Sequence, residues 1–316
     1  MAEVWQPPHS NRGAALITVL LVLAIATVIA VSAAVAQQLA VRKTQNMLNM
    51  EQAWQYALGL ELWAQAVLDQ DGRANDTDSS ADAWQAGIPD TVVPGGHLRA
   101  RIQDMQSRFN INNLLRNGEV SQFDLDRFQR LLQLLEIDAD LANAVLDWMD
   151  ADADSRFPGG AEDDVYMNRQ PSHRAANRLF ADKAELQLVE GVNAAIYQRL
   201  APHVVALPDY TAINVNTATA TSLAILADHL TRQDGEQLIR DRQDQPIENI
   251  SEWLDQPLFE DGNLTPEGLG VASDYFQVLG EVQVAQRQLR HETLLYRGKG
   301  RGTRVVQRSR RGFFDG

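Results

Sequence analysis

The sequence predicts an α+β protein in which a long amino-terminal helix precedes an antiparallel sheet, and a large all-α insertion interrupts that sheet. Three observations predict this fold. An uncharged apolar run of 23 residues stands near the amino terminus. Helical periodicity dominates residues 113–271, and two-residue alternation appears on both sides of that region. A chain of 316 residues is long enough for more than one structural unit.

The apolar run, AALITVLLVLAIATVIAVSAAVA, occupies residues 14–36. As a helix it would be about 35 Å long, enough to cross a hydrocarbon core of about 30 Å. The alternative interpretation of this run is a cleaved signal peptide, whose apolar region has about 7 to 15 residues. The longer run favours a retained membrane helix, and Arg12 in front of it favours a cytoplasmic amino terminus.

Residues 37–70 contain no proline and continue the helix as a spine outside the membrane. Apolar side chains recur there at steps of three and four, which predicts one face packed on a globular domain. These side chains are Met47, Met50, Trp54, Leu58 and Leu62. Turn-forming residues after residue 70 are expected to end the helix.

The first part of the sheet domain is predicted within residues 71–112. A strand is expected over residues 97–103, where Leu98, Ala100 and Ile102 alternate with polar residues. At the carboxyl end, residues 272–316 contain three further alternating runs. They are expected to form an antiparallel meander that pairs with the first strand.

Between these strands, two helical modules are predicted over residues 113–210 and 211–271. The first contains a capping arrangement at Ser121, a helix through Leu141 and a further helix after Ala184. In the second, Asn216 or Thr217 is the expected helix cap. Apolar residues at Ile247, Ile250 and Leu254 indicate another helix. The asparagines Asn110, Asn112 and Asn113 are expected to be buried and to bond to the backbone of turns.

Charge and composition exclude several classes of function. The formal net charge is −14, but residues 287–316 carry +7, which leaves −21 for the rest of the chain. An acidic body argues against nucleic-acid binding. Glu190, Gly191 and Val192 are the nearest match to a DNA-binding hairpin turn, but the second glycine is missing. Cysteine is absent, which excludes thiolate catalysis, and no catalytic constellation is evident, so we predict a protein that is not an enzyme.

An acidic segment around a Pro-Gly-Gly turn is the candidate metal site. The spacing of its first aspartates matches the first ligand positions of an EF-hand loop, but Ser155 stands where glycine is expected and the glutamate comes one position late. The alternative is a solvated acidic loop with aspartate caps. We expect a structural Ca²⁺ site, whose candidate oxygen donors are Asp150, Asp152, Asp154, Glu162 and Asp163.

The amino-terminal segment MAEVWQPPHSNRG, which ends in Arg12 and Gly13, resembles the leader of type IV prepilins and type II secretion pseudopilins. That resemblance implies cleavage by a prepilin peptidase between Gly13 and Ala14, followed by methylation of the new amino terminus. Most members have glutamate at the fifth mature position, where this chain has Thr18. Its absence is typical of minor pseudopilin K, the subclass placed at the filament tip.

Three further segments resemble the K pseudopilins: Arg-Phe-Asn-x-Asn-Asn-Leu at 108–114, Asn-Val-Asn-Thr-Ala at 214–218 and the acidic Pro-Gly-Gly segment. The resemblance implies a pilin-like sheet with two SAM-like, helix-hairpin-like modules, and the acidic segment is similar to a calcium-binding loop. It also implies a non-enzymatic role at the pseudopilus tip, with pseudopilins I, J and H as partners and no nucleic acid.

The implied location is the bacterial inner membrane, crossed once, with the globular part in the periplasm and a role in protein export across the outer membrane. The alternative is a membrane-anchored periplasmic binding module whose helix stays uncleaved.

Overall fold

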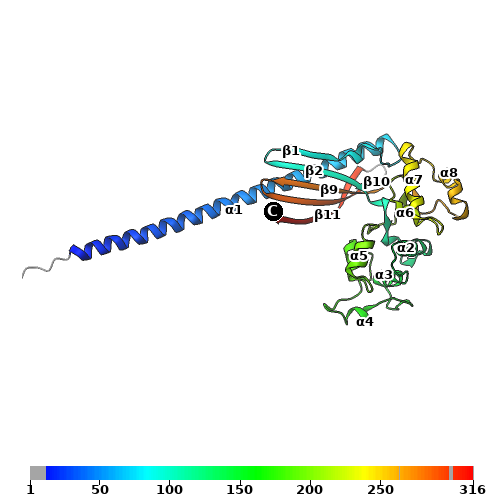
Figure 1. The fold of residues 1–316 in the computed structure, drawn as a ribbon, viewed down its shortest axis with the longest axis horizontal. Coiled ribbons are helices and arrows are strands. Elements are labelled where there is room, and N and C mark those ends of the chain that lie inside the picture. Colours follow the sequence, from blue (N-terminus) through cyan, green and yellow to red (C-terminus); the bar gives the residue numbers. More distant parts are fainter. Residues whose placement is uncertain (1–11, 263, 299–301, 316) are drawn as a thin grey trace, which may run out of the picture.

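The computed structural model describes residues 12–262, 264–298 and 302–315, and its most extended element is helix α1 (Arg12–Ala74) (Figure 1). At 1.5 Å per residue, its 63 residues span about 95 Å. Its amino-terminal half projects away from the globular part, and its carboxyl-terminal part lies on the sheet (Figure 1). Residues 1–11 of the expected leader lie outside the described residues. The Gly13–Ala14 bond lies in the first turn of α1.

The face of α1 that packs on the sheet differs from the predicted one. Met47, Met50 and Leu62 are exposed, so the expected stripe is wrong at these positions, whereas Trp54 packs against the core as predicted. The sheet is contacted instead by small residues and two leucines: Ala53, Ala57, Leu60, Ala64 and Leu68. The reason is the close approach of helix and sheet. A Cβ atom at Gly280 in the sheet would lie only 3.0 Å from Leu60 Cδ1.

The main sheet has five antiparallel strands in the order β1-β2-β9-β10-β11. Strand β2 pairs with β9, as the sequence predicted, and β9, β10 and β11 form the expected meander. The edge strand β1 was not predicted; it forms a hairpin with β2 through Gly95, whose φ is +84°. The strands are β1 (Ile88–Val93), β2 (Gly96–Asp104), β9 (Tyr275–Val284), β10 (Arg287–Gly298) and β11 (Gly302–Asp315).

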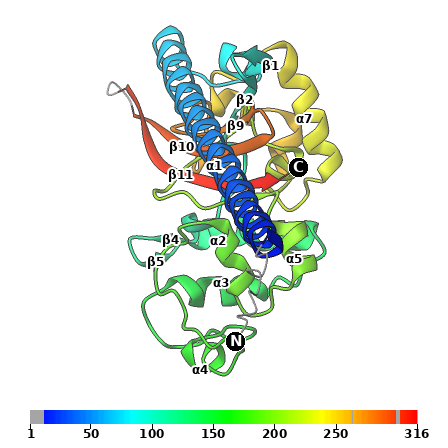
Figure 2. The ribbon, with the colours of Figure 1, turned by 90° about the vertical axis from the view of Figure 1, so that its left-hand side faces the viewer.

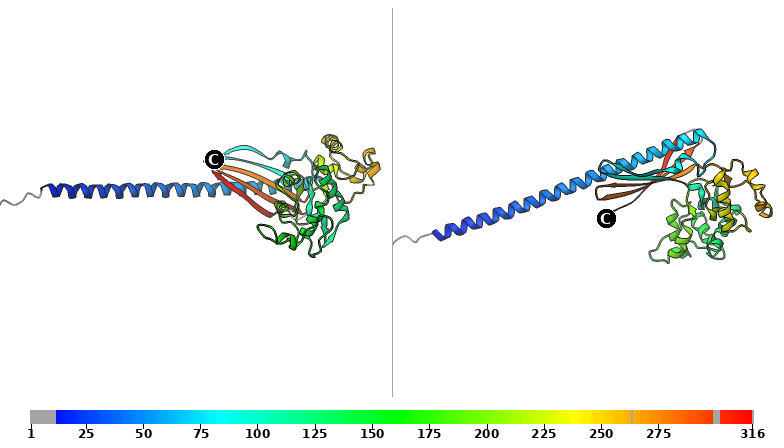
Figure 3. Two further views of the ribbon diagram at one scale, coloured as in Figure 1. Left: turned by 60° about the horizontal axis from the view of Figure 1, so that its bottom comes forward. Right: turned by 45° about the horizontal axis from the view of Figure 1, so that its top comes forward.

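The insertion joins β2 to β9 and lies at the end of the sheet that is remote from the projecting half of α1 (Figures 1 and 3). When α1 points toward the viewer, the sheet lies behind it and α2 to α5 lie below (Figure 2). The helices are α2 (Gln122–Leu134), α3 (Leu141–Met149), α4 (Asp163–Tyr166), α5 (Ala194–Leu200), α6 (Ala220–Ala224), α7 (Arg232–Asp244) and α8 (Ile250–Leu254).

Each half of the insertion is closed by a short parallel strand pair. In the first half, β3 (Phe109–Asn110) pairs with β6 (Val204–Val205). In the second, β7 (Ile213–Asn214) pairs with β8 (Leu269–Gly270). A small hairpin of β4 (Leu115–Arg116) and β5 (Glu119–Val120) precedes α2. Short 3-10 helices complete the fold: η1 (Ala83–Ala86), η2 (Met105–Ser107), η3 (Ile111–Leu114), η4 (Lys183–Leu188) and η5 (Pro257–Gly262).

Both halves begin with the same asparagine turn. Asn110 Oδ1 accepts a hydrogen bond from the backbone N–H of Asn112, and Asn214 Oδ1 accepts one from that of Asn216. All four side chains are buried. The prediction that Asn110 and Asn112 bond to turn backbone is therefore confirmed, and Asn113 likewise bonds to the backbone of Thr211 at both ends of its amide.

The second asparagine of each turn holds a distant segment by its backbone. Asn112 accepts from the N–H of Phe180 and donates to its carbonyl, both at 2.9 Å. Asn216 makes the same pair of bonds with Ile247, both at 2.8 Å. Two sequence-remote loops are fixed in the same way, and the buried apolar side chains of both halves form one continuous core.

The helix caps follow the sequence in part. Ser121 caps α2, and its Oγ donates to Asp124 Oδ2 at 2.6 Å, as expected from the capping arrangement. The expected cap of the second module is wrong, because α6 begins after Thr219. Asn216 is engaged with Ile247 instead. The helix expected after Ala184 begins later, as α5.

Candidate functional site

The acidic segment connects α3 to α4 at the side of the insertion away from the sheet (Figure 1). Asp150 is the residue directly after α3, and Glu162 directly precedes α4. Both side chains are buried, at 6% and 4% exposure. The two helix ends therefore bring together carboxylates that are 12 positions apart in the chain.

Three of the five predicted ligands come together. Asp150, Asp152 and Glu162 each offer an oxygen, and these oxygens all lie within 4.8 Å of one another. Asp154 and Asp163 are not in this group. The backbone N–H of Asp154 donates to Asp152 Oδ1, and its side chain is exposed. Asp163 Oδ1 accepts from the backbone N–H of Ala175 at 3.0 Å.

Two residues of this site were not among the predicted ligands. Asp147 is fully buried, and its carboxylate accepts the backbone N–H of Arg156 at 3.0 Å and Arg156 Nη1 at 2.6 Å. Arg156 also forms an ion pair with Asp150. The sequence signal for Asp147 is its position three residues before Asp150, because residues at that spacing share a helix face.

The electrostatics of the site are unfavourable without a cation. Burial, and then repulsion from Asp147, Asp150 and Asp152, raises the pKa of Glu162 to about 7. Burial also raises the pKa of Asp150. Among the described residues, Asp150 Oδ1 and Glu162 Oε1 are buried and have no hydrogen-bond partner.

Four carboxylates and one guanidinium leave an excess negative charge, and carboxylate oxygens are the ligands that Ca²⁺ prefers. The donors Asp150, Asp152 and Glu162 therefore fit a divalent cation. Arg156 joins Asp150 to Asp147 by ion pairs next to this group.

The amino-terminal half of α1 is the second functional element. An 18-residue window has a mean hydropathy of 2.8 and none of it is buried, so by length and composition α1 contains a segment able to cross a membrane. Thr18 is exposed on this segment, and its hydroxyl donates to the carbonyl of Ala15 at 2.9 Å. Thr18 therefore satisfies its polar group within the helix.

Known proteins match this chain over most of its length. Two sequence profiles, both described as type II secretion system (T2SS), protein K, match residues 107–209 and 213–272. Type II secretion system protein K of Pseudomonas aeruginosa is 38% identical over 95% of this chain and 93% of its own length. The Klebsiella pneumoniae protein of the same name is 33% identical, over 95% and 96% of the two chains.

A solved structure shares the fold. One chain in the crystal structure of the GspK–GspI–GspJ complex from the enterotoxigenic Escherichia coli type 2 secretion system superposes with a TM-score of 0.76 at 25% identity. The match covers 85% of this chain and 99% of that one. The curated relatives match nearly the whole sequence and the solved structure matches most of it, and the chain belongs to the type II secretion system protein K family.

Proposed function

We propose that this chain is a non-enzymatic minor pseudopilin at the tip of a type II secretion pseudopilus. The observation that carries the proposal is the unbroken helix α1, which joins a membrane-length apolar segment to a sheet-bound segment. Such a helix can anchor the subunit in the bacterial inner membrane by a single span. The globular part then lies in the periplasm and the amino terminus in the cytoplasm, as Arg12 favours.

The exposed apolar side of α1 supports packing against helices of other pseudopilins. Beyond the membrane-length segment, exposed side chains continue along α1: Leu39, Val41, Met47, Leu48, Met50 and Leu62. Exposed apolar surface of this extent is typical of interfaces. A structural neighbour forms a complex with GspI and GspJ. We therefore propose that pseudopilins I and J bind these exposed side chains of α1, and that pseudopilin H is a further partner.

The position of the insertion supports a place at the tip. It lies beyond the sheet in the direction away from the projecting half of α1, where α7 and α8 form the remote end (Figure 3). A further subunit stacked above would have to occupy that space. A tip subunit would also start filament assembly, from which export of folded proteins across the outer membrane would follow.

The leader residues fit the same proposal. A prepilin peptidase would cut between Gly13 and Ala14, and Ala14 would be methylated. Thr18 carries no charge to pair with the amino terminus of a neighbouring subunit, which a terminal subunit does not need. The alternative is a membrane-anchored binding module with an uncleaved helix. Amino-terminal sequencing of the chain from cells with an active peptidase separates them: a start at Ala14 supports the pseudopilin, and a start at Met1 supports the alternative.

Complex formation is tested with the full chain in detergent. It should co-purify with I and J pseudopilins of its own secretion system as a stable ternary complex. A chain that elutes alone at micromolar concentrations of both partners contradicts the proposed role. Leu62→Ser tests whether the exposed apolar side chains of α1 contact the partner pseudopilins. Arg101→Ser, on the sheet face opposite α1, is the matched control.

We further propose a structural Ca²⁺ ion at Asp150, Asp152 and Glu162. The cation would offset the repulsion that raises the pKa of Glu162, and it would fix a long loop with little apolar packing. Calorimetric titration of the full chain with calcium should show heat of binding that Asp152→Asn reduces. The control Asp126→Asn changes a half-buried residue of α2 outside the site and should bind as the wild type does. Equal binding by the wild type and Asp152→Asn contradicts this site.

A further inference from the structure

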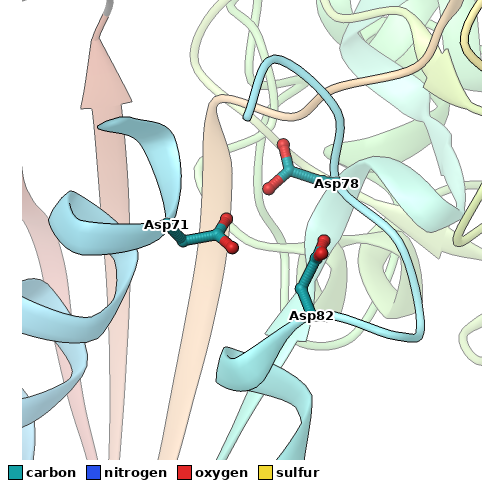
Figure 4. Close-up of side chains that lie close together, drawn as sticks. All are labelled: Asp71, Asp78 and Asp82. Atoms are coloured by element: carbon teal, nitrogen blue, oxygen red, sulfur yellow. The ribbon is translucent and has the colours of Figure 1, made fainter. Parts of the chain in front are cut away.

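A second group of carboxylates lies where the spine helix, the sheet and the insertion meet. Asp71 belongs to the last turn of α1, Asp78 to the following loop, and Asp82 to the start of η1. Their side chains face one another (Figure 4), and one oxygen of each lies within 4.8 Å of the others. Asp71 and Asp78 are buried, with exposures of 8% and 0%.

One atom of this group lacks a partner. Asp78 Oδ2 accepts the backbone N–H of Ser273 at 2.7 Å and forms an ion pair with Arg297. Asp78 Oδ1, in contrast, is buried and has no hydrogen-bond partner among the described residues. A buried carboxylate oxygen without a partner has lost its hydration with nothing in exchange, and a bound cation would offset that loss.

The local charge matches a divalent ion. Arg297 reaches two of the carboxylates, with Nη1 3.0 Å from Asp71 Oδ2. The carboxylate of the third, Asp82, accepts a hydrogen bond from the neutral backbone N–H of Ser79 at 2.6 Å. Three carboxylates and one guanidinium leave a charge of about −2, and like charges this close repel unless a cation lies between them.

A cavity of about 320 Å³ lies next to the group, and its lining contains Ser273 and Arg297, which both contact Asp78. Asp69 and Asp76 line it together with Arg73, whereas the three carboxylates of the group do not. Because Ca²⁺ takes about six to eight oxygen ligands, water would have to supply those that the three carboxylates do not.

We propose that Asp71, Asp78 and Asp82 form a second divalent-cation site, independent of the acidic loop in the insertion. Ca²⁺ is the favoured ion, because its variable coordination geometry accommodates carboxylates from a helix end, a loop and a 3-10 helix cap better than the strict octahedron of Mg²⁺ does.

The site has a structural consequence through Asp78. Its backbone N–H donates to the carbonyl of Val271 at 2.8 Å, and its carbonyl accepts from Asn214 Nδ2 at 3.0 Å. These two residues lie where the chain enters and leaves the second half of the insertion. A cation held by Asp78 would therefore stiffen the joint between the spine helix and the part of the insertion farthest from the membrane.

The test counts ions bound to the full chain in detergent at pH 7.5. Equilibrium dialysis against calcium chloride, followed by elemental analysis, gives calcium per chain for the wild type, Asp82→Asn, Asp152→Asn and the double variant. We expect Asp82→Asn to lose one ion and the double variant to lose the ions of both sites. Asp90→Asn, an exposed β1 residue with a side-chain exposure of 70%, is the control and should bind as the wild type does.

The outcomes are decisive in both directions. If Asp82→Asn retains the wild-type number of ions, the negative charge of the three carboxylates is balanced by protons and Arg297 alone. That result overturns the proposal. Should Asp82→Asn fail to give folded protein by circular dichroism, Asp71→Asn provides the same comparison. Loss of calcium only from Asp152→Asn would support the loop site and refute this one. Ternary-complex formation with I and J is scored separately, so the two proposals fail independently.

Discussion

Arg308 in the last strand, β11, forms a bidentate ion pair with Glu61 of the spine helix α1. Its Nε and Nη2 donate to the two carboxylate oxygens at 2.8 and 2.7 Å. Glu61 is only 4% exposed and also accepts from Thr293, at 3.1 Å. The edge strand β11 is thus held to α1 by charge as well as by packing, and the basic tail noted in the sequence contacts a carboxylate of the protein's own spine helix.

Arg308→Ala should destabilise the protein by about 2 kcal/mol, because it leaves the Glu61 carboxylate buried without its cation. Chemical denaturation at pH 7 measures the change. Arg304→Ala is the control, since Arg304 lies on the same strand and stacks on Tyr296 without an ion pair to α1 in the described residues. Equal losses for the two variants would show that the ion pair contributes nothing.

Ala57→Leu should destabilise the protein by about 1 to 3 kcal/mol, because Ala57 is fully buried where α1 meets the sheet closely. Leu62→Ala on the opposite side should change the free energy of unfolding by less than about 0.5 kcal/mol, since its side chain is 65% exposed. Thermal unfolding in detergent compares them. The reverse order would mean that the buried face of α1 has been assigned wrongly.

Asn112→Ala and Asn216→Ala should each lower the free energy of unfolding by about 2 to 4 kcal/mol. Each substitution leaves a buried backbone N–H and carbonyl of a distant loop without partners. Asn168→Ala removes one exposed bond, to the carbonyl of Asp164, and serves as the control. Urea unfolding followed by tryptophan fluorescence reports the loss, and a result within error of the control contradicts the clamp.

Glu162 should make stability pH-dependent in the absence of calcium. Its pKa rises from 4.5 to about 7 on folding, so the folded chain binds the extra proton between these values. The associated stabilisation is complete below pH 4.5 and is lost as pH rises through 7. In chelator, the stability of the wild type relative to Glu162→Gln should fall by about 3 kcal/mol from pH 4.5 to 8.

The same comparison with saturating calcium should show the opposite trend. Calcium competes with the proton for Glu162, so the wild type gains stability over Glu162→Gln as pH rises. Parallel pH profiles for the two proteins in chelator would contradict the assignment of the raised pKa. Identical profiles with and without calcium would contradict the proposed ion at that site.

Much of the candidate calcium site was predictable because its spacing is local. Asp150, Asp152 and Glu162 come from one short segment, and two helix ends hold them together. The roles of Asp154 and Asp163 were not predictable. Asp163, for example, accepts a hydrogen bond from the backbone N–H of Ala175. Asp71, Asp78 and Asp82 lie in or next to a segment that was expected only to end the helix. Their interpretation as a site depends on the ion pairs of Asp71 and Asp78 with Arg297, more than 200 positions away.

Local patterns in the sequence encode the membrane-length helix, the strands that flank the insertion and the asparagine turns that open its halves. Each depends on a local period or on neighbours a few residues apart. Tertiary packing sets the remaining features: Ala57, rather than Met50, faces the sheet, β1 forms an edge, and Glu61 pairs with Arg308. These outcomes depend on how closely surfaces from remote parts of the chain approach, and no local pattern contains that distance.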